Sequence, residues 1–296
     1  MAAARRDASI FLICGDLGYS VLEPFATEFP DRFLNAGVAE QNMTGVATGL
    51  ASCGYTVFTY SIANFPVFRC LEQIRNDICY HDLNVKIVSV GGGVAYGPAG
   101  YSHHATEDLA VMRHLPGMTV AAPGDPHETR AVVDALVCHP GPAYLRLGKA
   151  GEPNIHAQPI SLQVGESVEL RSGSDLTLIC TGGMLETAFW VSYQLGKQGV
   201  SAQVISMPFV SPIDGAAIER VGFFGKPIIT LEEHGSEGLG SAVAKLLLAA
   251  RFTGQFKSLK LAAKFIATAE NQKRLRQMLG LDPGEILGTA KLMCAA

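Results

Sequence analysis

The chain has 296 residues, of which 48% are hydrophobic and 17% charged, and a formal net charge of −4 at pH 7. That balance is typical of globular proteins with buried cores and excludes a largely disordered chain. The slight acidity gives no reason to expect a nucleic-acid partner. The apolar runs are too short to span a membrane, and the first residues resemble no signal peptide, so we expect no membrane association.

Cysteine and histidine usage indicates the compartment and the metal chemistry. The seven cysteines show no paired spacing, so we expect reduced thiols in a cytoplasmic protein. The eight histidines show no metal-ligand spacing apart from the adjacent His103 and His104. Neighbours on a chain rarely ligate one ion well, and we therefore predict no metal held by this chain's own side chains.

Short β-rich apolar runs alternate with helical patterns in the first half of the chain. The expected strands are Ser9–Cys14, Thr56–Tyr60, Val85–Val90, Thr119–Ala121 and Ala143–Leu147. The expected helices lie near Glu40–Cys53, Val67–Cys79, Thr106–Arg113 and Pro126–Cys138. This alternation predicts an α/β fold with a mostly parallel sheet.

The second half repeats this alternation after an irregular stretch. We expect strands at Leu176–Cys180, Ala202–Ser206, Pro227–Leu231 and Leu259–Phe265, and helices near Leu185–Gly196, Ser236–Ala250 and Gln272–Leu279. Glycine and proline punctuate Gly148–Pro159, which indicates a linker there. We therefore predict two open α/β domains, residues 1–152 and 169–296, joined by a linker at 153–168.

Glu40 is the first residue that suggests chemistry. The run Asp31–Met43 places this carboxylate at the start of the apolar, small-residue helix Met43–Ala51. Unpaired backbone N–H groups at a helix start favour the carboxylate, whereas apolar surroundings favour the neutral acid, and enzymes use such opposition to adjust an acid or base. The alternative is an ordinary helix-capping glutamate.

Other segments accompany the Glu40 segment in a fixed order. They are Tyr60–Phe65, Arg69–Asn76, Gly97–Leu109, Arg113–Met118 and Tyr144–Leu147. In this order and spacing the segments resemble the pyrimidine-binding domain of transketolases, and the chain from about residue 155 onward resembles the transketolase carboxy-terminal domain. The resemblance covers nearly the whole chain.

The resemblance implies thiamine diphosphate as cofactor. Glu40 stands where the family carries a glutamate that hydrogen-bonds a pyrimidine nitrogen of the cofactor and favours its imino tautomer, so that the cofactor's own amino group acts as base. Glu40 is therefore both a catalytic and a cofactor-binding prediction. The aminopyrimidine also needs an apolar slot with an aromatic face. Phe65 is the first candidate, with Phe68 and Tyr60 behind it, although core packing is an alternative for each.

His103 matches the histidine of the family's Gly-Glu-Asp-Gly-Pro-Thr-His-Gln signature. The resemblance implies that it contacts a substrate oxygen near the reactive carbon, where a histidine can donate a hydrogen bond or move a proton. His104 replaces the glutamine, and Pro98 and Ala99 replace the Glu-Asp pair. Because the family's aspartate helps to recognise a donor hydroxyl, these changes favour an unusual sugar donor or acceptor.

Four further positions are weaker candidates. Asp16 and Ser20 align with family positions near the thiazolium ring and substrate, although Asp16 could equally cap a turn. Lys149 stands where relatives carry a phosphate-binding arginine, and a solvated surface lysine is its alternative. Glu232–His234 lies in a glycine-rich context that would suit a cation or interface site, and we interpret it as structural.

Half of a cofactor site is missing from the sequence. The family holds the diphosphate and magnesium with a Gly-Asp-Gly segment and a later asparagine, and Gly15-Asp16-Leu17 breaks that pattern. The resemblance therefore implies the carboxy-terminal subunit of a split transketolase. An amino-terminal partner subunit would supply the diphosphate and magnesium site in an α2β2 assembly that moves a two-carbon ketol unit between sugars or sugar phosphates.

Two alternatives remain open at this point. One is the beta subunit of a 2-oxoacid-decarboxylating enzyme or a deoxyxylulose phosphate synthase-like enzyme, which share the pyrimidine domain. The other is a non-catalytic subunit that has lost its site, although the presence of both Glu40 and His103 argues against that loss.

Overall fold

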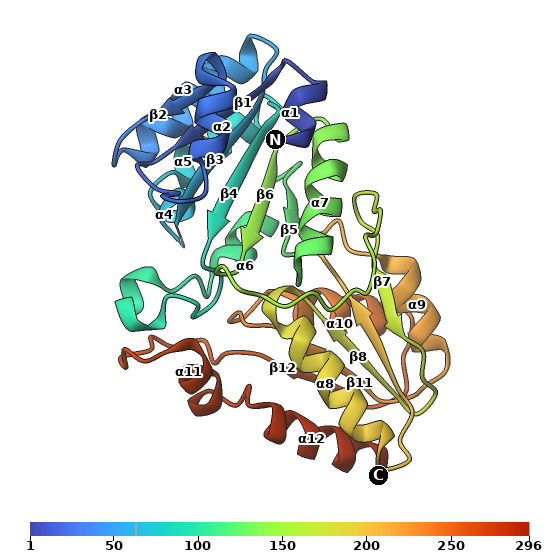
Figure 1. Cartoon of the computed structure of the whole chain (residues 1–296). Coiled ribbons are helices and arrows are strands. Elements are labelled where there is room, and N and C mark those ends of the chain that lie inside the picture. The colour runs from blue at the N-terminus through green and yellow to red at the C-terminus, as the bar shows by residue number, and fades with distance from the viewer. Residues whose placement is uncertain (63, 296) are drawn as a thin grey trace.

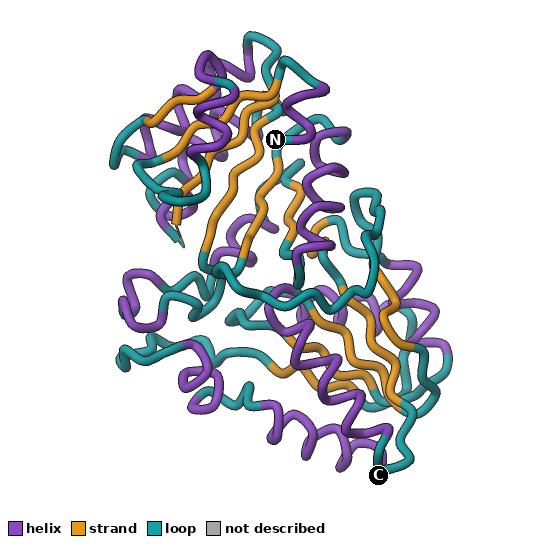
Figure 2. Tube along the Cα trace, in the orientation of Figure 1, coloured by secondary structure: helices purple, strands orange, loops and turns teal. Residues whose placement is uncertain are grey.

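The computed structural model describes residues 1–62 and 64–295; Ala63, within the predicted segment Tyr60–Phe65, and Ala296 lie outside the described residues. Two sheets, drawn as separate orange layers in Figure 2, are each flanked by helices. The chain builds them largely one after the other (Figure 1). The predicted fold class, two mostly parallel α/β sheets, is confirmed.

The first sheet has seven strands in the order β10-β5-β6-β4-β3-β1-β2. Its strands are β1 (Ile10–Cys14), β2 (Phe33–Asn35), β3 (Thr56–Ile62), β4 (Val85–Val90), β5 (Thr119–Ala121), β6 (Ala143–Leu147) and β10 (Phe209–Ser211). Its helices are α1 (Ala2–Arg6), α2 (Glu23–Glu28), α3 (Glu40–Ser52), α4 (Phe65–Phe68), α5 (Leu71–Gln73), a π-helical turn (Ile74–Cys79), α6 (Asp108–Arg113) and α7 (Pro126–Cys138). β1 and β3–β6 confirm the five predicted strands, with small shifts at the ends of β1 and β3.

The second sheet has five strands in the order β12-β11-β8-β9-β7. The strands are β7 (Val168–Arg171), β8 (Leu176–Cys180), β9 (Ala202–Ser206), β11 (Ile228–Leu231) and β12 (Phe256–Leu259). The helices are α8 (Leu185–Gly196), α9 (Gly215–Phe223), α10 (Leu239–Ala249), α11 (Gln272–Met278) and α12 (Pro283–Ala295). β7 is antiparallel to β9, and the other neighbours are parallel.

One short strand joins the two halves. β10 follows β9 in sequence but pairs antiparallel with β5 at the edge of the first sheet, with Phe209 opposite Ala121 and Ser211 opposite Val120. Phe209 is fully buried in the core formed by β5, β6 and α7. This strand is not predicted from the sequence, because its partner lies in the other domain.

Two predicted elements are wrong in extent. The strand predicted at Leu259–Phe265 is β12, which ends at Leu259, because the following chain leaves the sheet and Phe265 packs on Tyr101 of the first domain at 4.6 Å between ring centroids. The helix predicted at Val67–Cys79 is divided into α4, α5 and the π-helical turn.

α3 is held against the first sheet by small side chains. Its buried positions are Glu40, Met43, Thr44, Ala47 and Ala51, which recur with the spacing of one helical face. Ala47 and Ala51 let the helix approach the sheet closely. As a result, the first residue of α3 lies next to the carboxyl ends of β1 and β3, the edge of an open α/β sheet where ligands collect.

Candidate active site

The Glu40 side chain is buried at the carboxyl edge of the first sheet. Glu40 is 4% exposed, and a β-carbon placed on Gly15, after β1, would lie 3.8 Å from Glu40 Cγ and 3.6 Å from Ser61 Oγ of β3. Ala39 occupies the N-cap position of α3. Glu40 is therefore not the helix-capping residue of the alternative interpretation. Both of its carboxylate oxygens accept hydrogen bonds from Arg69 Nη1 at 3.0 Å.

Arg69 connects Glu40 to two other predicted residues. Its guanidinium carbon lies 4.1 Å from the centre of the Phe65 ring, and that ring lies 5.2 Å from the His103 imidazole. His103 Nδ1 lies 3.0 Å from Ser102 Oγ. The structure therefore links Glu40 through Arg69 to Phe65, and Phe65 in turn lies next to His103. We call these four residues the Glu40 cluster.

Arg69 has no predicted role from the sequence, although it begins the segment Arg69–Asn76 that resembles the transketolase family. A signal was present, because a carboxylate at the mouth of an apolar helix costs free energy unless a cation or hydrogen-bond donor satisfies it. Arg69 is the cation nearest to that carboxylate among the described ion pairs.

The other two candidate aromatic residues lie apart from the Glu40 cluster. Phe68 ends α4 and is 44% exposed. Tyr60 is half-buried in β3, where it packs against two hydrophobic clusters of the first domain and lines a separate cleft. Among the described residues, neither ring makes an aromatic or cation contact with the Glu40 cluster, which favours Phe65.

The cleft beside Tyr60 has a volume of about 830 Å³. It lies where β1, β3, β4 and β6 end, and its lining includes Tyr19, Tyr60, Tyr96 and Lys149. Lys149 is exposed, and its Nζ lies 5.6 Å from the centre of the Tyr96 ring. Lys149 thus presents a cation at this cleft, as a phosphate-binding residue would.

Asp16 and Ser20 lie in the loop after β1, next to the cleft. Both have left-handed backbone conformations, with φ of 56° and 64°. Asp16 Oδ1 accepts hydrogen bonds from Asn35 Nδ2 at 3.0 Å and Tyr19 Oη at 3.1 Å, and the Ser20 N–H donates to Glu23 Oε1. The Asp16 carboxylate therefore also shapes its own loop.

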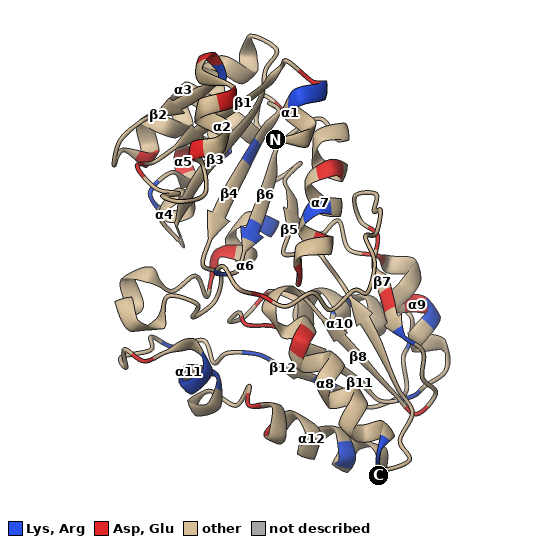
Figure 3. Ribbon diagram, in the orientation of Figure 1, with Lys and Arg blue, Asp and Glu red and all other residues tan. Residues whose placement is uncertain are grey.

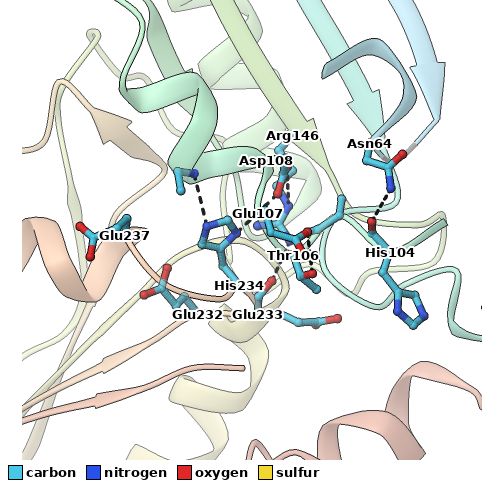
Figure 4. Close-up of polar contacts among 12 residues, drawn as sticks. Asn64, His104, Thr106, Glu107, Asp108, Arg146, Glu232, Glu233, His234 and Glu237 are labelled. Carbon is cyan, nitrogen blue, oxygen red and sulfur yellow. Dashed lines mark hydrogen bonds and ion pairs between the residues drawn. The ribbon is translucent and has the colours of Figure 1, made fainter. Parts of the chain in front are cut away.

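The loop that carries His103 is held at several points. Asn64 Nδ2 donates to the carbonyls of Ser102 at 3.3 Å and His104 at 2.8 Å (Figure 4). His104 is 1% exposed, and burial lowers the pKa of its imidazole. Pro98 and Ala99 form an exposed 3-10 turn in the same loop.

Glu232–His234 lies against this loop rather than at the surface. Glu232 accepts hydrogen bonds from the first N–H groups of α10, and Glu233 accepts from the Val94 N–H at 2.7 Å and pairs with Arg276. His234 faces Asp108 of α6 (Figure 4). Acidic segments from both domains meet here, near α6 in Figure 3. These contacts support the interpretation of Glu232–His234 as structural.

The described part of the chain offers no cluster of three or more His, Cys, Asp or Glu side chains suited to a metal ion. None of its helices is long and apolar enough to cross a membrane.

Fold and site together define a class of protein: a two-domain α/β chain with a buried, arginine-paired glutamate at the edge of its first sheet. Family profiles match the transketolase pyrimidine-binding domain over residues 1–151 and the transketolase C-terminal domain over residues 165–286. The chain therefore belongs to the transketolase family.

Similar proteins indicate which members of the transketolase family this chain resembles. The chain is 39% identical over 247 residues to one subunit of the apulose-4-phosphate transketolase of Phocaeicola vulgatus, covering 82% of this chain and 79% of the relative. It is 35% identical over 246 residues to a 6-deoxy-6-sulfo-D-fructose transketolase subunit of a Clostridium species, covering 82% and 76%. The chain is also 34% identical over 279 residues to the 1-deoxy-D-xylulose-5-phosphate synthase 1 of Geobacter sulfurreducens, covering 93% of this chain but 43% of that protein.

A solved structure gives the same result. A split gene transketolase, described as an inactive beta4 tetramer, matches with a TM-score of 0.89 and 33% identity, covering 99% of this chain and 94% of that one. The chain thus corresponds to the carboxy-terminal subunit of a split transketolase, which favours the main prediction over the deoxyxylulose phosphate synthase alternative.

Proposed function

We propose that this chain is the pyrimidine-side subunit of a two-chain, thiamine diphosphate-dependent transketolase that transfers a two-carbon ketol unit between sugars. The observation that carries the proposal is the buried Glu40 carboxylate at the carboxyl edge of the first sheet, linked through Arg69 to the Phe65 ring, which lies next to His103. A carboxylate, an aromatic face and an imidazole are the groups that an aminopyrimidine and a sugar substrate require.

The residues present fit the aminopyrimidine half of the cofactor. Ser61 Oγ is buried beside Glu40 without a hydrogen-bond partner, as expected where a polar ligand completes the site. Gly37 precedes α3 with φ of 73° and open space where a β-carbon would stand. The backbone at Gly37 is therefore open beside the start of α3, and Glu40 and Ser61 supply polar groups there.

Each residue of the site has a separate task. When bound, thiamine diphosphate supplies the nucleophilic carbon and the electron sink. Glu40 holds a proton at a pyrimidine ring nitrogen, and its burial strengthens that hydrogen bond because the local dielectric constant is low. Phe65 packs on the aminopyrimidine ring. His103 donates a hydrogen bond to a substrate oxygen near the reacting carbon.

The partner completes the cofactor site. The described residues provide no acidic cluster for magnesium, so we assign the diphosphate and magnesium to an amino-terminal subunit, with activity only in an α2β2 heterotetramer. The solved relative that consists of beta subunits alone is described as inactive, which agrees with this assignment. The described cysteines are all unpaired, which agrees with a cytoplasmic enzyme.

The substrate is a sugar or sugar phosphate outside the ordinary ketose phosphates. Pro98 and Ala99 remove the carboxylate that transketolases aim at a donor hydroxyl. Lys149 offers a single charge at the cleft, where an arginine would offer a bidentate fork. The two named relatives are transketolase subunits for apulose 4-phosphate and for 6-deoxy-6-sulfo-D-fructose, which supports specialised sugar chemistry.

Reconstitution with the amino-terminal subunit tests the proposal. The pair is assayed with thiamine diphosphate and magnesium, separately with sugar ketoses and with pyruvate. Transfer of a two-carbon unit between sugars is expected. Release of carbon dioxide from pyruvate would favour the 2-oxoacid alternative, and a correctly assembled but inactive pair would favour the non-catalytic one.

A further inference from the structure

Arg69 contacts an aromatic ring in addition to the carboxylate that it neutralises. A single guanidinium nitrogen, Nη1, lies 3.0 Å from both carboxylate oxygens of Glu40, and the guanidinium carbon lies 4.1 Å from the centre of the Phe65 ring. One group therefore contacts both residues that we assign to the aminopyrimidine.

The Arg69 backbone is fixed next to the same helix. Its carbonyl accepts a hydrogen bond from Gln41 Nε2 at 2.8 Å, and Gln41 follows Glu40 in α3. The Glu40 side chain is 5% exposed, whereas that of Arg69 is 49% exposed. The Arg69 side chain is therefore not held in place by burial in the core. Its position depends on the hydrogen bonds to Glu40 and on the stack against Phe65.

These contacts suit arginine and suit lysine less well. A planar guanidinium can stack on an aromatic face while it donates to a carboxylate at its edge. A lysine ammonium would supply the charge to Glu40 as a compact point, without the stack on Phe65. The two functions of Arg69 can therefore be separated by substitution.

Building on the proposed function, we propose that Arg69 is a positioning residue for cofactor activation. It keeps the Glu40 carboxylate aimed at the aminopyrimidine site and fixes the distance between that carboxylate and the Phe65 ring. It acts through these two side chains and takes no part in the reaction itself.

The test compares Arg69→Gln, Arg69→Lys and a control, Arg75→Gln, in the pair reconstituted with thiamine diphosphate and magnesium. Arg75 is exposed in the same segment and donates to Asn76 Oδ1. Two quantities are measured: cofactor affinity by calorimetry, and hydrogen–deuterium exchange at the thiazolium C2 at saturating cofactor. Melting temperatures establish that each variant is folded.

We expect Arg69→Gln to slow exchange at saturation by about 10- to 100-fold, by analogy with the loss seen when a hydrogen-bond partner that orients a metal ligand is removed. Arg69→Lys should recover most of the exchange rate but keep a weakened affinity, because the charge returns without the stack. Arg75→Gln should match the wild type in both quantities.

The outcomes separate the two proposals. Wild-type exchange in folded Arg69→Gln, with slow exchange in Glu40→Gln, would reject the positioning role and leave the proposed function intact. Equal exchange in Arg69→Lys and Arg69→Gln would also reject it. If the wild-type pair shows no exchange, or Glu40→Gln exchanges normally, the proposed function itself fails.

Discussion

His234 Nδ1 lies 3.5 Å from Asp108 Oδ1, and both side chains are fully buried where α6 of the first domain meets the loop before α10 (Figure 4). The Ala110 N–H donates to His234 Nε2 at 3.3 Å, which leaves Nδ1 on the side that faces Asp108. Arg146 Nε lies 3.4 Å from Asp108 Oδ2, which also accepts from Tyr144 Oη at 2.6 Å.

This buried network ties the second domain to the loop that carries His103. Arg146 Nη2 donates to the carbonyls of Ala105 at 3.0 Å and Glu233 at 2.7 Å, and the Gly235 N–H donates to the Thr106 carbonyl at 2.8 Å. The carboxy-terminal domain therefore holds the segment that follows His103 in place.

Asp108→Asn is expected to destabilise the chain by about 3–5 kcal/mol at neutral pH, because it leaves Arg146 buried without its counter-charge. Burial alone would raise the pKa of Asp108, but Arg146, His234 and Tyr144 together hold it below its usual value. The stabilisation is therefore complete above the unfolded-state pKa of about 3.9 and is lost as the pH falls through the lower folded-state pKa. Urea unfolding at pH 7 and below pH 4 measures both effects.

Asp134→Asn is the matched control for Asp108→Asn. Asp134 pairs with Arg6 at 3.4 Å, but both side chains are more than half exposed. Exposed ion pairs contribute little, so this variant should unfold like the wild type. An equal loss of stability in the two variants would show that burial of the Asp108 network is unimportant.

Most strands of both sheets could be predicted because their sequences are short, β-rich and mostly apolar. Parallel strands covered on both faces are nearly continuous apolar segments, as at Leu176–Cys180, whereas β4 keeps a β-rich pattern although it includes Lys86 and Ser89. β10 has three residues and gains its stability from a partner in the other domain, which no local pattern reports. Leu259–Phe265 was overextended because an apolar pattern does not reveal that Phe265 packs across the domain boundary.

Site residues could be predicted where they stand at a position of the family signature. They could not be predicted where their role depends on contacts between separate segments of the chain. Glu40 and His103 came from motif positions, and the structure brings both to one cluster. Arg69 was missed because its role depends on a pair of contacts formed only when α3 and α4 pack together. The roles of all these residues, like the domain boundaries, stay predictions.

Glu40→Gln preserves the size of the side chain but removes its charge. We expect proton exchange at the cofactor's reactive carbon to slow by about 100- to 10,000-fold in the reconstituted pair, the usual cost of losing a positioned acid or base. Glu72→Gln, at an exposed position in α5, serves as the control. Exchange close to the wild-type rate in Glu40→Gln would rule out the assigned role.

The isolated chain should not bind thiamine diphosphate tightly, even with magnesium, because the diphosphate half of the site belongs to the partner. Isothermal titration of the chain alone is expected to give no measurable binding, and addition of the amino-terminal subunit should restore it. Affinity in the micromolar range for the chain alone would contradict the two-chain site.

Lys86 should make the stability of the folded chain depend on pH in the alkaline range. It is fully buried in β4, donates to the carbonyls of His139 and Gly141 at 2.7 Å, and burial lowers its pKa to about 8 although Asp82 opposes the change. Above this pH the folded chain releases a proton that the unfolded chain keeps until about pH 10.4. Stability should therefore rise across this window through Lys86.

Comparison with Lys86→Met isolates the Lys86 effect, because other groups titrate in the same range. The difference in unfolding free energy, wild type minus variant, should increase by about 2.5 kcal/mol between pH 8 and pH 10.4. Urea unfolding at several pH values provides the measurement. Parallel curves for the two proteins would show that burial does not lower the pKa of Lys86.

Donor choice should depend on the loop at Pro98 and Ala99. Ala99→Asp restores a carboxylate that transketolases use to read a donor hydroxyl, and the position is exposed in a 3-10 turn that tolerates it. Such a contact is typically worth about 1–3 kcal/mol, so kcat/KM for xylulose 5-phosphate should rise by roughly 10- to 200-fold. Steady-state assays of the reconstituted pair compare Ala99→Asp with Ala99→Asn, which adds similar bulk without the charge. Ordinary transketolase efficiency of the wild type with xylulose 5-phosphate and ribose 5-phosphate would show that Pro98 and Ala99 do not set the preference.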